Sequence, residues 1–163
     1  MAKTRFVAEP GKKEIVISRV FDAPRDLVFR TITDPRFIPK WWGPKRLTTT
    51  VDKMDTRPGG TWRFVQRDAD NNTYAFHGVY REIVPPERLV STFEYEGMPG
   101  HELIETVTLE DQNGKTLITD TVVFKSVNDR ENTLQSGMES GAVESMERFA
   151  EIFSKAGDND KKG

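Results

Sequence analysis

The sequence predicts one α+β domain in which a curved antiparallel sheet of about seven strands packs against a long C-terminal helix. Three observations support this prediction. Strand-like segments rich in β-branched and aromatic residues follow one another at hairpin spacing between about residues 47 and 127. Apolar residues recur at spacings of three and four across the stretch 128–157. The length of 163 residues, without an internal repeat or a linker, suits a single domain.

The first strand and two short helices are predicted near the N-terminus. The strand is EIVISRVF (14–21), in which the side chains alternate between two faces. A helix follows in DAPRDLVFRTITDP (22–35), because Pro24 suits its first position and apolar residues recur at helical spacing. The second short helix is PRFIPKWW (35–42), which a Gly-Pro pair ends.

Six further strands are predicted between these helices and the C-terminal helix. Turns rich in Gly, Pro, Asn or Asp separate them, such as PGG at 58–60 and DQNG at 111–114. Strands joined by such short turns pair mainly in antiparallel fashion. The predicted strand segments are 47–57, 61–67, 73–84, 88–96, 101–110 and 115–124.

The C-terminal helix is predicted to run without a break from a cap at Asn128 or Asp129 to an end at Gly157. A single sheet buries the apolar stripe of such a helix most economically by curling around it. Glycine in a helix interior costs about 1 kcal/mol relative to alanine, so Gly137 and Gly141 need a reason. Either the helix backbone approaches the sheet closely there, or the missing side chains leave room for a cavity. The stripe consists of Leu134, Met138, Ala142, Met146, Phe149 and Phe153.

Residues 1–13 and 157–163 are polar and are expected to be flexible tails, which leaves 14–156 as the domain.

Composition excludes several classes of function. A formal net charge of −2 argues against a nucleic-acid partner. The chain has no cysteine, which excludes disulfides and thiolate chemistry. Without an apolar run of membrane-spanning length or a signal sequence, we expect a cytoplasmic protein without a membrane partner, monomeric or homodimeric.

The motifs predict no cofactor, no metal site and no catalytic constellation. The two histidines, His77 and His101, have no spacing typical of zinc ligands. The chain has no G-x-S-x-G nucleophile elbow, and the PGG turn at 58–60 lacks the Lys-Ser/Thr of a phosphate-binding loop. The paired acids of EYEG (94–97) and HELIE (101–105) have the pattern of a solvated strand face.

Four segments are similar to the START-related helix-grip (SRPBCC, Bet v-like) superfamily. More narrowly, they resemble proteins like the C-terminal domain of the activator of heat-shock protein 90 ATPase. The resemblance covers about residues 14–155 and implies a helix-grip fold with an apolar cavity between the sheet and the long helix. The superfamily includes lipid and hormone binders, polyketide cyclases, stress proteins and co-chaperone domains, so the fold alone does not fix an activity. The segments are FDAPRDLVFRTITDPRFIPKWWGP, MDTRPGGTWRFV, HGVYREIVPPERLVSTFE and SGMESGAVESMERFAEIF.

Aromatic residues at alternating strand positions are the candidate walls of this cavity. Met138 and Phe149 face them from the predicted helix, and Gly78 allows curvature or a close approach. The same residues would serve as ordinary core if no cavity exists. The ligand-binding candidates are Trp41, Trp42, Trp62, Phe64, Phe76, His77, Tyr80, Phe93, Met138 and Phe149.

Several of these residues leave two interpretations open. Trp41 and Trp42 either pack the short helix against the sheet or form the lid of the cavity, with one ring touching the ligand. His77 is either a hydrogen-bonded surface residue or a proton shuttle inside the cavity. Arg63 and Arg81 would hold a ligand carboxylate if they point inward, but the alternation of side chains along the strands favours an outward direction.

Three functions are compatible with these expectations. The first is binding of a small apolar or amphipathic molecule, with a role in stress response. The second is a cyclase-, aromatase- or hydrolase-like enzyme, which requires polar groups such as His77, Arg63 or Thr106 to converge inside the cavity. The third is regulation of a chaperone through an exposed surface.

Overall fold

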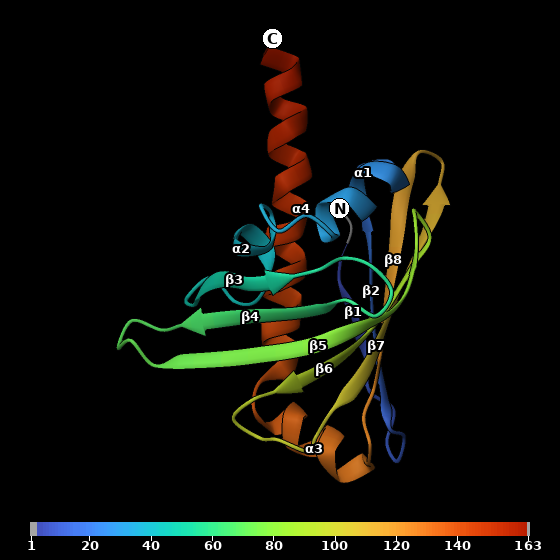
Figure 1. Ribbon diagram of the computed structural model, residues 1–163. Helices are drawn as coiled ribbons and strands as arrows, with labels where there is room; N and C mark the ends of the chain where they lie inside the picture. The colour runs from blue at the N-terminus through green and yellow to red at the C-terminus, as the bar shows by residue number, and fades with distance from the viewer. Residues whose placement is uncertain (1–2, 163) are drawn as a thin grey trace.

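The computed structural model of the protein describes residues 3–162, with side chains up to Ser154. It contains one antiparallel sheet of eight strands in the order β1-β2-β8-β7-β6-β5-β4-β3. The sheet curves around the C-terminal helix α4, as the helix-grip fold requires (Figure 1). The strands are β1 (Arg5–Val7), β2 (Glu14–Phe21), β3 (Thr48–Met54), β4 (Thr61–Arg67), β5 (Thr73–Val84), β6 (Arg88–Tyr95), β7 (Leu103–Gln112) and β8 (Lys115–Val123).

Strand β1 corrects the prediction that residues 1–13 are a flexible tail. Arg5–Val7 pairs with β2, and Phe6 stands opposite Ile17. Phe6 also packs against the core cluster that contains Ile17 and Ile15. A run of three residues is too short to show a strand period, so only the free edge of β2 makes this segment a strand. The sheet therefore has eight strands rather than about seven.

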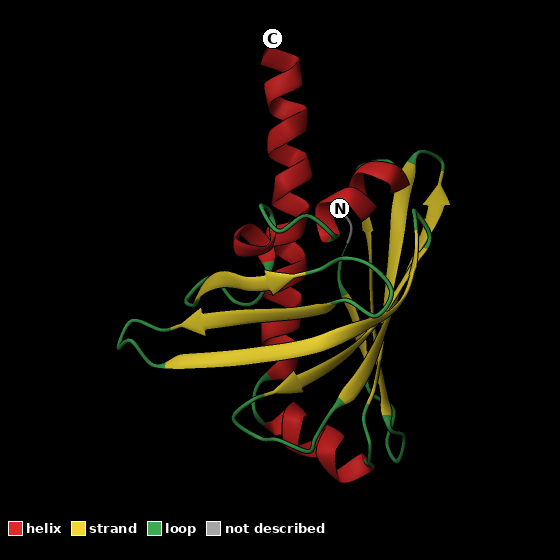
Figure 2. Cartoon of the chain, in the orientation of Figure 1, coloured by secondary structure: helices red, strands yellow, loops and turns green. Residues whose placement is uncertain are grey.

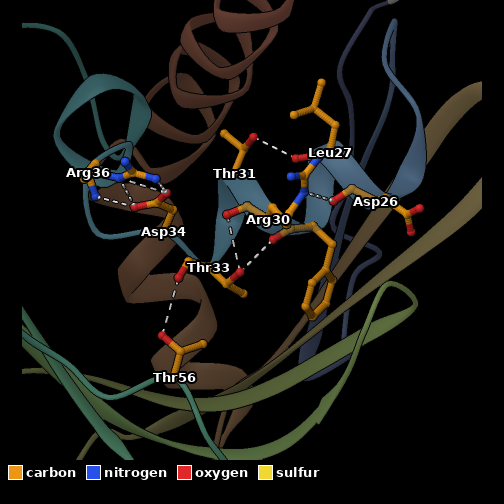
Figure 3. A network of polar contacts seen from close by, with 9 residues as sticks. Asp26, Leu27, Arg30, Thr31, Thr33, Asp34, Arg36 and Thr56 are labelled. Carbon is orange, nitrogen blue, oxygen red and sulfur yellow. Dashed lines mark hydrogen bonds and ion pairs between the residues drawn. The ribbon is translucent and has the colours of Figure 1, made fainter.

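Helices α1 (Arg25–Ile32) and α2 (Ile38–Trp41) carry the chain from β2 to the opposite edge strand β3. Side-chain hydroxyls close the end of α1, where Thr31 and Thr33 donate to backbone carbonyls one turn earlier (Figure 3). The Thr56 hydroxyl donates to the Thr33 carbonyl at 3.4 Å and so joins α1 to the turn after β3. Helix α2 lies against the middle of α4, whereas the third helix, α3, lies at the lower end of the molecule (Figure 2).

The long C-terminal helix is interrupted, contrary to the prediction. It consists of α3 (Val127–Gln135) and α4 (Met138–Lys162), which are separated at Gly137. Gly137 has a φ of 94°, a left-handed conformation that glycine adopts without a steric penalty. The N-cap is Ser126, whose hydroxyl accepts from the Asp129 amide at 3.0 Å, rather than Asn128 or Asp129. Helix α4 also continues past Gly157, into the predicted C-terminal tail.

Two apolar clusters hold α4 against the sheet. In the larger cluster the ring of Phe21 meets those of Phe149 and Phe153 edge to face, with centroids 5.0 and 6.3 Å apart. The smaller cluster is built around Ile15 and Phe124 and is covered by residues near the start of α4. Within residues 3–162, no helix combines the length and apolar character that crossing a membrane requires.

Candidate functional site

A hollow of about 330 Å³ lies between the concave face of the sheet and α4. Side chains from β2, β4 to β8, α2 and α4 line it, and most of them are apolar. A second hollow of about 570 Å³ adjoins the first and reaches the loop between β6 and β7. Volumes of this size accommodate small organic ligands. The lining residues common to both hollows are Gln66, Phe76, Phe93, Glu105, Val122 and Met138. We refer to the two hollows together as the cavity.

Trp42 projects from the end of α2 toward the aromatic side chains of the sheet. Its ring centroid lies 5.1 Å from that of Phe64 and 5.3 Å from that of Phe76. Trp62 and Phe93 complete this group at 6.4 and 6.3 Å. The aromatic rings of three strands and the α2 segment therefore form one continuous apolar wall.

Trp41, the neighbouring residue, packs on α4 instead. Its ring lies 4.9 Å from that of Phe149. The α4 residues Ser145 and Arg148 fix this segment, because the Ser145 hydroxyl donates to the Trp41 carbonyl at 2.9 Å and Arg148 donates to the Gly43 carbonyl at 2.7 Å. Both tryptophans line the cavity, one beside the helix and the other beside the sheet. The α2 segment thus closes one end of the cavity.

Two of the glycines singled out in the sequence, Gly141 and Gly78, affect the cavity in different ways. A Cβ on Gly141 would meet no atom within 4 Å, and Gly141 lines the cavity. Of the two reasons considered for this helical glycine, room for a cavity is the one that fits. Gly78 is the opposite case, because a Cβ there would overlap the Thr92 carbonyl oxygen and the Trp62 indole nitrogen. Close packing therefore requires glycine at position 78.

Nine of the ten candidate residues line the cavity, and His77 does not. His77 lies on the outer face of β5, where its imidazole is 3.1 Å from Glu94 and 3.0 Å from Glu96. The reason is alternation along the strand, because Phe76 and Gly78 point inward. The nine lining residues are Trp41, Trp42, Trp62, Phe64, Phe76, Tyr80, Phe93, Met138 and Phe149.

A charged network surrounds His77 on this outer face. Arg63 donates to both carboxylate oxygens of Glu96, at 2.8 and 3.0 Å. The hydrogen bonds from Arg63, and then that with His77, lower the pKa of Glu96 to about 2. Arg81 also points outward and lies 4.0 Å from Glu102. These arginines are therefore not placed to contact a molecule in the cavity, as the alternation predicted.

Two carboxyl groups inside the cavity were not among the sequence candidates. Glu105 of β7 and Asp120 of β8 both line it. Glu105 was interpreted as part of a solvated strand face, but its partner Val122 is 3% exposed and its side of the strand faces inward. Asp120 follows Ile118 on the buried face of β8. Asp120 could have been recognised in the sequence as a single acid on a mostly apolar strand face.

Asp120 lies in surroundings that solvate a charge poorly. Burial, together with the negative charge of Glu105 and a hydrogen bond with it, raises the pKa of the Asp120 carboxyl well above its usual value. Burial likewise raises the pKa of Tyr80, with a smaller contribution from Glu105. Among the described residues, no group of three or more histidine and acidic side chains is arranged to hold a metal ion.

Comparison with known proteins identifies relatives of this fold. Residues 22–154 match the sequence model of the family described as Activator of Hsp90 ATPase homolog 1-like protein. No curated protein matches the sequence.

Solved structures of bacterial proteins share the architecture. A protein from Arthrobacter aurescens has a TM-score of 0.86 at 23% identity and covers 93% of this chain and 91% of its own. A protein from Mycobacterium smegmatis has a TM-score of 0.83 at 21% identity, with coverages of 91% and 95%. A protein from Chromobacterium violaceum has a TM-score of 0.75 at 26% identity, with coverages of 86% and 96%. At these identities the likeness establishes the fold.

Proposed function

The chain belongs to the Activator of Hsp90 ATPase homolog 1-like family, and we propose that it is a binding protein that holds a small, largely apolar molecule in the cavity between the sheet and α4. The observation that carries this proposal is the cavity itself. It has a volume in the range of ligand sites, aromatic walls and a helical glycine that keeps it open.

The packing of the aromatic walls also supports binding. Trp62 and Phe64 are only 5% and 4% exposed, so neighbouring side chains hold the two rings in place. An apolar molecule that enters such a space removes its own apolar surface from water at about 25 cal/mol per Å². The fixed positions of these rings limit the conformational entropy that binding would cost.

The enzyme interpretation was based on three residues that do not line the cavity. His77 and Arg63 belong to the charged network on the outer face of the sheet. Thr106 points away from the cavity as well, because its neighbours Glu105 and Val107 line it. Convergence of these three groups in the cavity, which the enzyme interpretation required, is therefore not found.

Substitution of Gly141 by leucine tests the proposed function. A Cβ at this position meets no atom within 4 Å, so we expect the leucine side chain to extend into the cavity and fill part of it. We expect wild-type protein to bind a neutral apolar probe, 2-naphthylethanol, in a calorimetric titration, and Gly141→Leu to bind it at least about tenfold more weakly. Glu147→Leu, an exposed position of the same helix, is the matched control and should bind like wild type.

Two results would contradict the proposal. One is a wild-type protein that does not bind the probe at concentrations at which the probe is soluble. The other is Gly141→Leu protein that is folded and binds as tightly as wild type. A thermal melt separates occlusion of the cavity from loss of the fold, because leucine is the better helix former and should not lower the melting temperature.

A further inference from the structure

Glu105 and Asp120 are neighbours on the concave face of the sheet. In the register of β7 and β8, Glu105 stands opposite Val122 and Asp120 stands opposite Val107. The two carboxyl groups therefore lie diagonally across one strand pair, on the side that faces α4. Ile17 of β2 stands opposite Asp120 on the other side. The pair thus interrupts a surface that is otherwise mostly apolar.

The protein around the pair provides neither a complete set of hydrogen bonds nor a counterion. The Asp120 Oδ1 atom is buried and has no hydrogen-bond partner among the described residues. Every ion pair within residues 3–154 involves acids other than Glu105 and Asp120. In that part of the chain, therefore, no lysine, arginine or histidine nitrogen lies within 4.0 Å of either carboxyl group. Arg19 lies on the same face of β2 but donates to Thr4.

The remaining polar groups of the cavity do not supply a positive charge next to the pair. In the first hollow they are Ser91, Gln66, Ser145, the hydroxyl of Tyr80 and the indole N–H groups of the three tryptophans, of which those of Trp41 and Trp62 have no hydrogen-bond partner among the described residues. The second hollow has charged or titratable groups besides Glu105, among which His101 is paired with Asp129 at 2.8 Å. These groups are Arg46, Tyr74, Tyr95, His101 and Asp129.

We propose that Glu105 and Asp120 are the polar anchor of the cavity and that its ligands are amphipathic amines, with an apolar body against the aromatic wall and one protonated nitrogen at the carboxyl pair. This inference rests on the proposed function and names its ligand class. A monovalent ammonium group brings the positive charge that no side chain of the described residues supplies beside the pair. An ammonium group also supplies the hydrogen-bond donor that Asp120 Oδ1 lacks.

The charge decides between an amine and an alcohol of the same shape. Both can donate a hydrogen bond to a carboxyl oxygen, but only the ammonium ion neutralises a charge that the protein leaves without a counterion. Hydrogen bonds to charged groups are stronger than those between neutral groups. The expected preference for the amine is therefore about tenfold.

The experiment compares 2-naphthylethylamine with 2-naphthylethanol, which differ only in the terminal group. Each probe is titrated calorimetrically at pH 7.5 into wild-type protein, Asp120→Asn, Glu105→Gln and the double variant. We expect wild type to bind the amine about tenfold more tightly than the alcohol. The double variant should lose this preference, because its amide groups carry no charge for the ammonium group to neutralise. Glu102→Gln, an exposed acid of the same segment that is paired with Arg81, is the control and should keep the preference.

The outcomes separate the two proposals. Equal binding of amine and alcohol by wild type, or an amine preference that survives in the double variant, would overturn the anchor and leave the binding function standing. Failure of both probes to bind would contradict the binding function and the anchor together. A preference that disappears in Glu102→Gln as well would overturn the assignment to Glu105 and Asp120, because the effect would then follow the overall charge.

Discussion

The carboxyl group of Asp120 is in an unfavourable position for a charge. Its neighbours on the same face of β8, Ile118 and Val122, are each 3% exposed. The nearest charged group that acts on it is another acid, Glu105. A buried acid that is retained without a counterion lowers the stability of the fold, and a function in ligand recognition would explain the position.

Replacement of Asp120 by asparagine should stabilise the protein at neutral pH. The folded-state pKa of Asp120 is raised above 3.8, so its protonated form is favoured in the fold. Its contribution to stability is therefore fully present below about pH 3.8 and is lost as the pH rises through the raised folded-state value. We expect Asp120→Asn to increase the free energy of unfolding at pH 7 by on the order of 1 kcal/mol, and by less at pH 4. Urea denaturation at the two pH values measures this difference.

The exposed acid Asp70 provides the control for this experiment. Asp70 lies in the turn between β4 and β5, and Asp70→Asn changes the formal charge by the same amount as Asp120→Asn. The free energy of unfolding of the Asp70→Asn protein should differ from that of wild type by less than about 0.5 kcal/mol at either pH. A destabilised Asp120→Asn protein at pH 7 would show that the native carboxylate is better solvated than its position implies.

At the scale of the elements, Gly137 and Gly141 show why the predicted long helix is two helices. Both lie on or beside the apolar stripe, and both looked equivalent in the sequence. Gly137 has a φ of 94° and marks the break between α3 and α4, whereas Gly141 is an ordinary helical residue over open space. Helical periodicity continues across the break, so the apolar pattern alone could not locate it.

Alanine substitutions at these two positions should have opposite effects on stability. Gly137→Ala forces a Cβ into a left-handed conformation, which is expected to lower the free energy of unfolding by about 1 kcal/mol. Gly141→Ala removes the entropic disadvantage of glycine and should raise it by about 0.4–1 kcal/mol. Thermal and urea denaturation of the two variants provide the comparison. Equal destabilisation of both would mean that Gly141 is also held in a special backbone conformation.

The elements that the sequence predicted well are those with a strong local pattern. The strands β2 to β8 and the two short helices are found close to their expected segments, because alternation and turn residues determine them. Strand β1 has no pattern of its own and depends on the free edge of β2. The position of His77 could have been predicted from the same alternation that placed Phe76 inside.

At the scale of the whole molecule, the curvature of the sheet and the path of α4 create the cavity together. The aromatic wall was predictable, because inward positions of adjacent strands could be read from the sequence. The depth of the space was not predictable, since it depends on how far the α2 segment and α4 stand from the sheet. Ser145 and Arg148 set part of that distance through hydrogen bonds to the Trp41 and Gly43 carbonyls.

Native mass spectrometry of the protein purified from its own cells tests the central claim most directly. The measurement compares wild type with Gly141→Leu. As a positive control, 2-naphthylethylamine is added to wild-type protein that carries no bound molecule, to show that a ligand in the cavity is retained during the measurement. We predict that wild type carries an additional mass, identifiable as a molecule with an apolar body and a basic nitrogen, and that Gly141→Leu does not. A wild-type protein of bare mass that retains the added amine, or the same additional mass on both proteins, would contradict the account.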